Sequence, residues 1–220
     1  MGDDKGDRMT DLYTFEDGTV ANPDEVNHNF LLADRGIEKG IEVFEEDGTF
    51  TVPDEVPRIK VIVVGAGGGF DDGNDQHGGG GGGGTAIKIL DVGEDLDAGD
   101  EITVTVGDGV KGSGGETSSF GEFCSATGGG SGSTGGGSTS GQSGGSGGIG
   151  VDGDLNLEGG GGGKSYTADD RDIDMHGGGT YLAGPARARA EGTQYGGGHG
   201  AYCGLGEQRA GADGVVVVMY

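Results

Sequence analysis

The sequence predicts a mainly β protein in which β-sandwich-like strands alternate with packed glycine-rich segments of polyglycine-II type, preceded by one short N-terminal helix. Three observations predict this fold. Short stretches alternate with the period of two that is typical of strands, 58 of the 220 residues are glycine, and the glycine runs repeatedly begin and end at strand patterns. We expect an N-terminal segment at 1–40 and a glycine-rich β domain at 41–220.

The N-terminal segment carries the signals of a helix at about residues 23–34. Pro23 suits the first helical position, and Gly36 is a typical stop. Val26 and Phe30 are i, i+4 neighbours and share one face. Because so short a helix is unstable alone, we expect its apolar face to dock on copies of itself or on a neighbouring protein.

Two hairpins are predicted from turn residues between alternating stretches. IEVF and TFTV flank Asp47-Gly48, which is a typical two-strand turn. The stretch at 148–157 has the same form around Asp152-Gly153. Each pair of flanking strands is therefore expected to lie side by side.

Four further strands are predicted from their apolar patterns. RIKVIVV is apolar on both faces, which suits a central strand. The apolar stretch GVVVVMY is expected to be a buried strand rather than a tail. The four predicted strands lie at 58–64, 86–90, 101–106 and 214–220.

Glycine-rich runs fill the chain between the strands. The alternative is a set of flexible Gly/Ser linkers, but strand patterns and aromatic residues recur among the runs. Collagen is excluded because glycine does not recur strictly at every third residue. Extended glycine segments can approach closely and bond one another through their outward-pointing N–H and C=O groups. We therefore expect Gly78–Gly84 to be ordered, extended and packed against other glycine segments. The runs lie at 65–69, 78–84, 112–115, 128–148, 159–163, 177–179 and 196–200.

The charge balance is strongly acidic, with 38 Asp+Glu against 13 Lys+Arg and a formal net charge of -25. Binding to nucleic acid needs a basic footprint and is excluded. The scattered acids favour a surface adapted to high salt over an acidic tail. No run approaches the length of a membrane span, so no membrane insertion is expected. Cys124 and Cys203 are expected to be buried or free thiols, with a disulfide as the open alternative.

Two clusters share an order of acids, then a histidine, then a glycine run, which predicts two equivalent loop tips. Ca²⁺ and Mg²⁺ take carboxylate oxygens, so both clusters are candidate cation sites, with solvated acidic loops as the alternative. The first cluster comprises Asp71, Asp72, Asp75 and His77. The second comprises Asp169, Asp170, Asp172, Asp174 and His176.

The sequence argues against an enzyme. GAGGG follows the strand at 58–64, but no helix follows to hold a pyrophosphate at its N-terminus. No Ser/His/Asp order with supporting context is present, and acids scattered over glycine loops do not form a paired-carboxylate site. We therefore expect a binding or structural protein.

Three stretches resemble the glycine-rich tip proteins of tailed-virus fibres. DGTVANPDEVNHNFL at 17–31 is similar to a short N-terminal segment of phage tail-fibre and other virion proteins. FTVPDEVPRIKVIVVGAGGG at 50–69 is similar to the entry into their glycine-rich domain. The stretch at 102–130, with YGGGHGAYCG at 195–204 and GADGVVVVMY at 211–220, resembles the middle and closing strand.

The resemblance implies a homotrimeric virion protein on the external surface, a tail-fibre or spike component that attaches to the host. Its N-terminus would join other virion proteins, and loops between glycine segments would bind a host-surface glycan or S-layer protein. The acid content departs from the usual phage version and fits a halophilic host, with cations bridging the contact. The alternatives are a purely structural capsid decoration or spike, and a disordered glycine-rich linker.

The stretch at 164–200 is the expected receptor-facing region. It holds the one local basic spot, in ARARA, flanked by tyrosines, which offer a large contact area at low entropy cost. The alternative for the arginines is surface ion pairing. The residues predicted to face the receptor are Tyr166, Tyr181, Arg187, Arg189, Tyr195 and His199.

Overall fold

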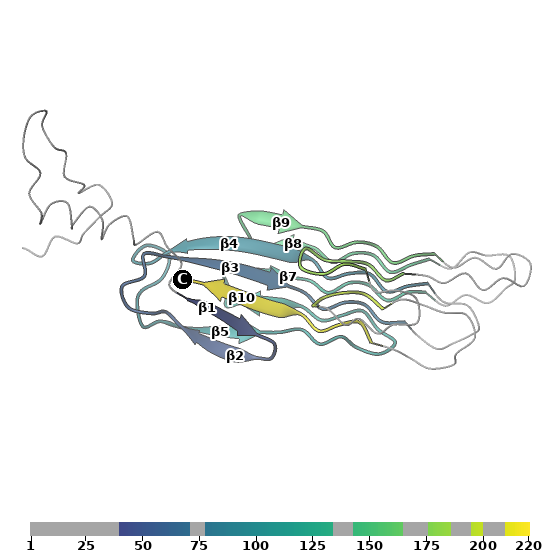
Figure 1. Cartoon of the computed structure of the whole chain (residues 1–220), viewed down its shortest axis with the longest axis horizontal. Coiled ribbons are helices and arrows are strands. Elements are labelled where there is room, and N and C mark those ends of the chain that lie inside the picture. Colours follow the sequence, from purple (N-terminus) through teal and green to yellow (C-terminus); the bar gives the residue numbers. More distant parts are fainter. Residues whose placement is uncertain (1–39, 71–77, 134–142, 165–175, 186–194, 200–209) are drawn as a thin grey trace, which may run out of the picture. The chain divides into compact units, whose positions relative to one another are not determined.

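The computed structural model describes residues 40–70, 78–133, 143–164, 176–185, 195–199 and 210–220. By its contacts the chain divides into two units, and all but the first of these residues belong to the second unit, Ile41–Tyr220. The helix predicted at 23–34 lies outside the described residues. Within them the protein is mainly β, with ten strands in two antiparallel sheets (Figure 1).

The first sheet has the strand order β1-β10-β3-β4-β9. Its strands are β1 (Ile41–Phe44), β3 (Arg58–Val64), β4 (Thr85–Asp91), β9 (Leu155–Leu157) and β10 (Val215–Met219). The apolar RIKVIVV stretch forms the middle strand, as predicted, because both of its faces are covered. The apolar stretch at 214–220 forms β10, which is largely buried between β1 and β3.

The second sheet has the strand order β2-β5-β6-β7-β8. Its strands are β2 (Gly48–Thr51), β5 (Glu101–Thr105), β6 (Ser118–Phe120), β7 (Cys124–Ala126) and β8 (Gly150–Val151). Alternation in β5 buries Ile102 and Val104 and exposes Thr103. Strands β6 and β7 were not predicted, because three residues are too few to display a period.

The hairpin predicted at Asp47 is wrong in its pairing, and the one predicted at Asp152 pairs only at its base, where Ile149 and Glu158 form an antiparallel bridge. β1 pairs with β10 and β2 pairs with β5, so the turn at Asp47 carries the chain from one sheet to the other. The Asp47 carboxylate accepts a hydrogen bond of 2.8 Å from the Val106 amide, which ties this turn to the end of β5. The turn at Asp152, a residue with a positive φ of 59°, likewise joins β8 of the second sheet to β9 of the first.

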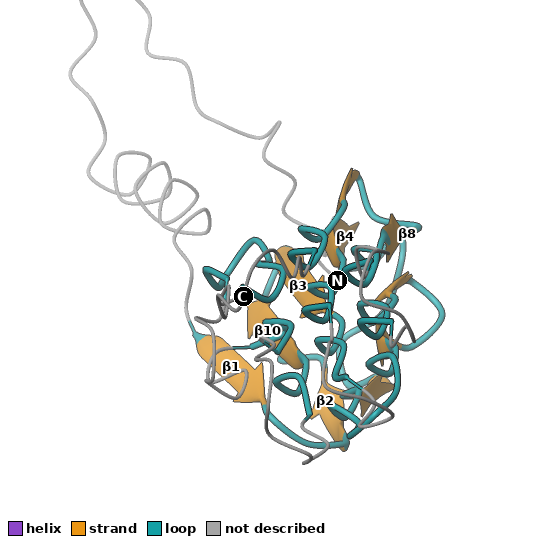
Figure 2. Cartoon of the chain, turned by 90° about the vertical axis from the view of Figure 1, so that its right-hand side faces the viewer, coloured by secondary structure: helices purple, strands orange, loops and turns teal. Residues whose placement is uncertain are grey.

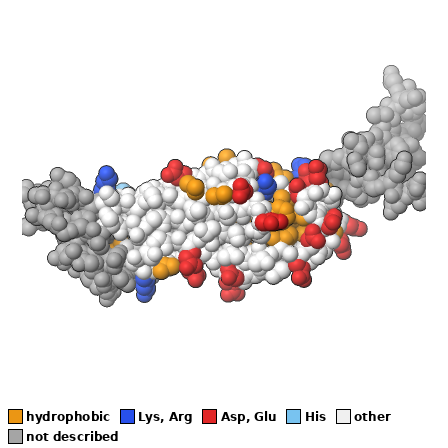
Figure 3. Space-filling model, turned by 180° about the vertical axis from the view of Figure 1, so that it is seen from behind, with side chains coloured by type: hydrophobic (Ala, Val, Ile, Leu, Met, Phe, Trp, Pro, Cys, Tyr) orange, Lys and Arg blue, Asp and Glu red, His pale blue; other side chains and the backbone are white. Residues whose placement is uncertain are grey.

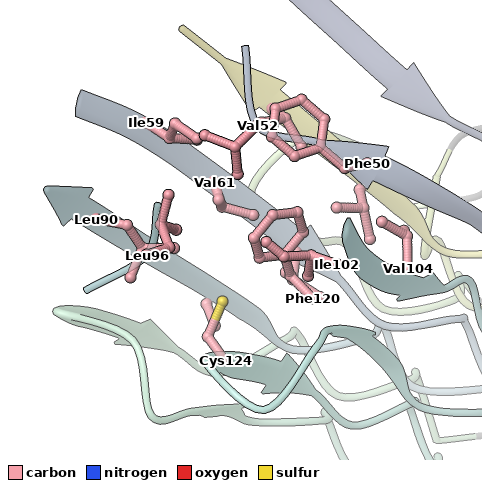
Figure 4. Close-up of a cluster of buried hydrophobic side chains, with 14 of the residues drawn as sticks. Phe50, Val52, Ile59, Val61, Leu90, Leu96, Ile102, Val104, Phe120 and Cys124 are labelled. Atoms are coloured by element: carbon pink, nitrogen blue, oxygen red, sulfur yellow. The ribbon is translucent and has the colours of Figure 1, made fainter. Parts of the chain in front are cut away.

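One hydrophobic core fills the space between the inner faces of the two sheets (Figure 4). Val61 of β3 faces Phe50 of β2 and Phe120 of β6, whose ring centroids are 5.8 Å apart. Cys124 lies in this core as a free thiol, and burial raises its pKa to about 11. Cys203 lies outside the described residues. The sheets thus form a sandwich-like arrangement closed by side chains.

Beyond the sheets the strands run on without interruption into glycine-rich segments that lie side by side (Figure 1). We call this part the glycine bundle. β3 continues into 65–69, β7 into 127–133 and β9 into 158–163, while 78–84 leads into β4. The bundle is therefore an extension of both sheets, which explains why glycine runs begin and end at strand patterns.

Gly78–Gly84, the central segment, donates hydrogen bonds to three neighbours in rotation. The amides of Gly78, Gly81 and Gly84 bond carbonyls in 127–133, at 2.9 to 3.3 Å. Those of Gly79 and Gly82 bond 160–163, and those of Gly80 and Gly83 bond 196–199. A repeat of three residues per neighbour is the pattern of a helix with three residues per turn and outward-pointing amides.

The carbonyl groups of the central segment serve three other neighbours. They accept hydrogen bonds from amides in 65–68, 145–148 and 176–179. The central segment is therefore surrounded by bonded segments, which appear as separate coils in the end view of Figure 2. The prediction that Gly78–Gly84 is ordered, extended and packed against other glycine segments is confirmed.

Candidate functional site

The far end of the glycine bundle, away from the sheets, is where four sequence segments leave and re-enter the described structure. These segments are 71–77, 134–142, 165–175 and 200–209. We call the set of residues that flank them the loop-bearing end. It comprises Phe70, Gly78, Ser133, Ser143, Gly163, Lys164, His176, His199 and Ala210.

Direct hydrogen bonds hold the residues of the loop-bearing end together. The Gly78 amide bonds the carbonyl of Ser133 at 3.3 Å, and the Gly163 amide bonds that of His176 at 2.9 Å. Ser133 and Ser143 are joined by their backbones at 3.0 Å and by the Ser133 hydroxyl, which bonds both the amide and the carbonyl of Ser143. The bases of these segments are thus fixed by backbone atoms, largely independently of side-chain identity.

His199 lies inside the loop-bearing end rather than on its surface. Its side chain is 1% exposed and its ring centroid lies 5.1 Å from that of Phe70, which is 3% exposed. The prediction that His199 faces a receptor is therefore wrong. Its backbone amide bonds the Gly68 carbonyl and its own carbonyl accepts from Gly80, which draws the ring into the bundle.

Tyr181 and Tyr195 lie near the junction of sheets and bundle, not at the loop-bearing end. The Thr180 hydroxyl bonds the Tyr195 carbonyl at 3.0 Å, which holds the two stretches together. The side chains of Tyr181 and Tyr195 are 59% and 39% exposed. The Tyr195 hydroxyl bonds the carboxylate of Glu45, and this hydrogen bond raises the pKa of the tyrosine. Both residues are exposed, but they lie away from the loop-bearing end, and their predicted receptor contact stays a prediction.

The remaining predicted site residues lie mostly outside the described residues. Tyr166, Arg187 and Arg189 are among them. So are Asp71, Asp72, Asp75, His77, Asp169, Asp170, Asp172 and Asp174. His176 is described and exposed, at the base of the segment that holds the second acidic cluster. Over the described ranges, no group of three or more His, Cys, Asp or Glu side chains is placed to hold a metal ion.

The sequence analysis did not predict that several acidic side chains accept hydrogen bonds from backbone amides of distant elements. The Asp213 carboxylate accepts a 2.7 Å hydrogen bond from the Gly109 amide, and Asp154 accepts one of 2.8 Å from Ile89. Asp47 does the same for Val106. Asp47 and Asp213 each precede a glycine, a pairing typical of turns, and this is the signal that could have identified them. Part of the acid content therefore joins elements of the fold.

Charged side chains are unevenly distributed over the described surface. On the face shown in Figure 3 they gather toward the strands, whereas the adjoining glycine bundle shows mainly backbone and uncharged side chains. On this face the glycine bundle therefore carries little charge.

In the described part of the chain, no helix has the length and apolar character needed to cross a membrane.

Comparison with protein families assigns most of the chain to one family. Residues 44–220 match the family model of a glycine-rich domain. The chain belongs to this glycine-rich domain family. The match covers β2 to β10 and the whole glycine bundle, and it begins at the last residue of β1. None of the curated proteins matches the chain.

Proposed function

We propose that this glycine-rich domain protein is a tail-fibre or spike component of a virus particle and that it attaches the particle to the surface of a host cell. In this role the glycine bundle is a rigid shaft, and the segments that leave its loop-bearing end carry the contact. The role is recognition rather than catalysis. The alternative is a structural spike or capsid decoration without a receptor.

One observation supports the proposal above others: four segments of varied sequence are flanked by residues fixed at one end of a single bundle. Binding residues are often placed on loops held by a rigid scaffold. Backbone hydrogen bonds fix the bases of these segments, so their sequences can change without altering the shaft. Two of the segments hold the acidic clusters, which suits a contact bridged by cations to a glycan or S-layer protein.

The proposal is tested by competition. Purified protein at saturating concentration is expected to block adsorption of the virus that carries it to susceptible cells, in high salt. Chelation of divalent cations is expected to weaken this block. If saturating protein leaves adsorption unchanged while antibodies locate the chain on the particle, the structural alternative holds instead.

A matched pair of variants locates the contact. Conversion of three carboxylates in 169–174 to amides is expected to reduce cell binding by tenfold or so, in the range typical of a few lost charge contacts. The control removes the same charge near the strands, by Glu→Gln at Glu94, Glu101 and Glu122. Equal binding by both variants would show that the acidic segment is not the contact.

A further inference from the structure

The outer face of the first sheet is apolar across all five strands. The cross-strand register aligns outward side chains in two rows. The first row is Val43, Val217, Ile62, Ile87 and Leu155. The second row is Ile41, Met219, Lys60 and Ile89. We call these two rows the apolar face.

In the single chain the apolar face is buried at its centre, where Ile62 is 5% exposed, and exposed toward its edges. Ile62 forms a second hydrophobic cluster, separate from the core, with Val64, Val215 and their neighbours. Ile41 and Leu155, on the two edge strands β1 and β9, are 61% and 50% exposed. A contiguous exposed apolar surface of this kind marks an interaction site.

The second sheet supplies an internal comparison. Its outward residues are polar, as in Thr49 and Thr51 of β2 and Thr103 of β5, all of which are exposed. Antiparallel sheets with one solvated face normally show this alternation. One molecule therefore carries a sheet built to face water and a sheet built to face apolar side chains.

We propose that the apolar face packs against the same face of a second copy of this chain, forming a two-fold symmetric dimer. Charge supports this partner. The chain carries a formal charge of -25, so most contacts between copies are repulsive, but the two rows contain no carboxylate and one cation, Lys60. A flat face that packs on itself gives two-fold symmetry, and the inference is independent of host attachment.

The size of the face also fits a second copy. The nine positions of the two rows, each about 4.8 Å wide across the strands and about 7 Å long along them, give a projected area of about 300 Å². An interface that buries roughly 800 Å² on each partner has an apolar core of about this extent, with a polar rim. Two sheets can pack about 10 Å apart in the aligned manner, as the two sheets within one chain do.

The test is the molar mass of the full chain in solution at about 1 M salt, where charge repulsion is screened to about 3 Å. Light scattering is expected to give twice the 21.7 kDa of one chain. The Val43→Lys/Ile89→Lys variant is expected to raise the dimer dissociation constant at least tenfold. The control variant, Thr51→Lys/Thr103→Lys, changes the charge equally on the second sheet and is expected to remain a dimer.

A second variant distinguishes a weakened dimer from a misfolded chain. Leu155→Ser alters a half-exposed side chain on the edge strand β9 and is expected to weaken the dimer while the unfolding transition stays cooperative. A monomer at all concentrations overturns the inference, as does a mass of three chains. So does a dimer that the variants of the apolar face leave unchanged.

Discussion

The central segment requires glycine because the backbones of neighbouring segments lie too close to leave room for a Cβ atom. A Cβ built on Gly81 would lie well under 3.0 Å from the carbonyl oxygen of Ser146, and one on Gly80 would meet Gly68 in the same way. The obstructing atoms belong to the backbone, which cannot move aside as a flexible side chain does. Close approach, rather than an unusual φ, therefore fixes glycine at these positions.

A pair of alanine substitutions tests this requirement. Gly81→Ala is expected to lower the free energy of unfolding by about 3 kcal/mol or more, because overpacking forces bonded backbones apart, and Gly81→Val is expected to prevent folding of the bundle. Gly161→Ala is the control, since its Cβ would lie 3.5 Å from the nearest atom. It should be neutral or stabilising by about 0.5 kcal/mol. Similar denaturation curves for the two alanine variants would contradict the packed bundle.

Cys124 makes stability depend on pH. Burial raises its pKa from 9.0 to about 11, so between these values the unfolded chain loses the thiol proton while the folded chain keeps it. Stability is therefore full below pH 9 and falls as the pH rises toward 11, by on the order of 1 to 2 kcal/mol. Chemical denaturation across this range should show the fall, and Cys124→Ala should lack this component. An equal fall in the variant would assign it to other groups.

At the scale of elements, carboxylates join segments that are distant in the sequence. Asp213, just before β10, accepts from the Gly109 amide beyond β5 and so links the two sheets at the start of the bundle. Asp47 links the turn after β1 to the end of β5. These contacts hold each sheet's continuation in register with its neighbour.

Substitution of Asp213 tests such a link. Asp213→Ala is expected to lower the free energy of unfolding by about 1 to 2 kcal/mol, because the Gly109 amide loses its acceptor. Asp213→Asn keeps an oxygen at this position and should recover much of the loss. Thermal unfolding of the three proteins measures the difference. If the alanine variant is as stable as the parent, the link has no energetic role.

The elements that the sequence predicted well are those with local signals. β5 displays a period of two and β3 a continuous apolar run within single stretches of sequence, and the extended form of Gly78–Gly84 follows from its glycine content. The pairing of β1 and β2 was mispredicted because a turn at Asp47 is equally compatible with a crossing between sheets, and the choice depends on distant β10 and β5.

In the candidate site, too, features with a local signal were predicted from the sequence and features that depend on distant contacts were not. Exposure of Tyr181 was predicted from residue type, whereas burial of His199 depends on its contact with Phe70, far away in the chain. The apolar face was also hidden from sequence reasoning. Ile41 and Val43 alternate like core residues, and only the strand order shows that they point away from the core.

At the scale of the whole described unit, the sheets and the glycine bundle that continues from them are stabilised by different interactions. Apolar side chains hold the sheets together, and backbone hydrogen bonds hold the glycine bundle together. Strands pass from one region to the other without a break, so the two regions are expected to unfold as one cooperative unit. The sheets thereby set the register that the bundle, with few side chains, cannot set alone.

Amide hydrogen exchange at Gly78–Gly84 tests the central claim that the glycine runs are a folded scaffold. Because every amide of the segment donates a hydrogen bond to a neighbour, exchange at all seven positions should be slowed by about 1,000-fold or more, as in the core strand β3. Gly112, which lies in a turn and whose amide donates no backbone hydrogen bond within the described residues, provides the comparison. Exchange across Gly78–Gly84 at the rate of an unstructured peptide would contradict the account.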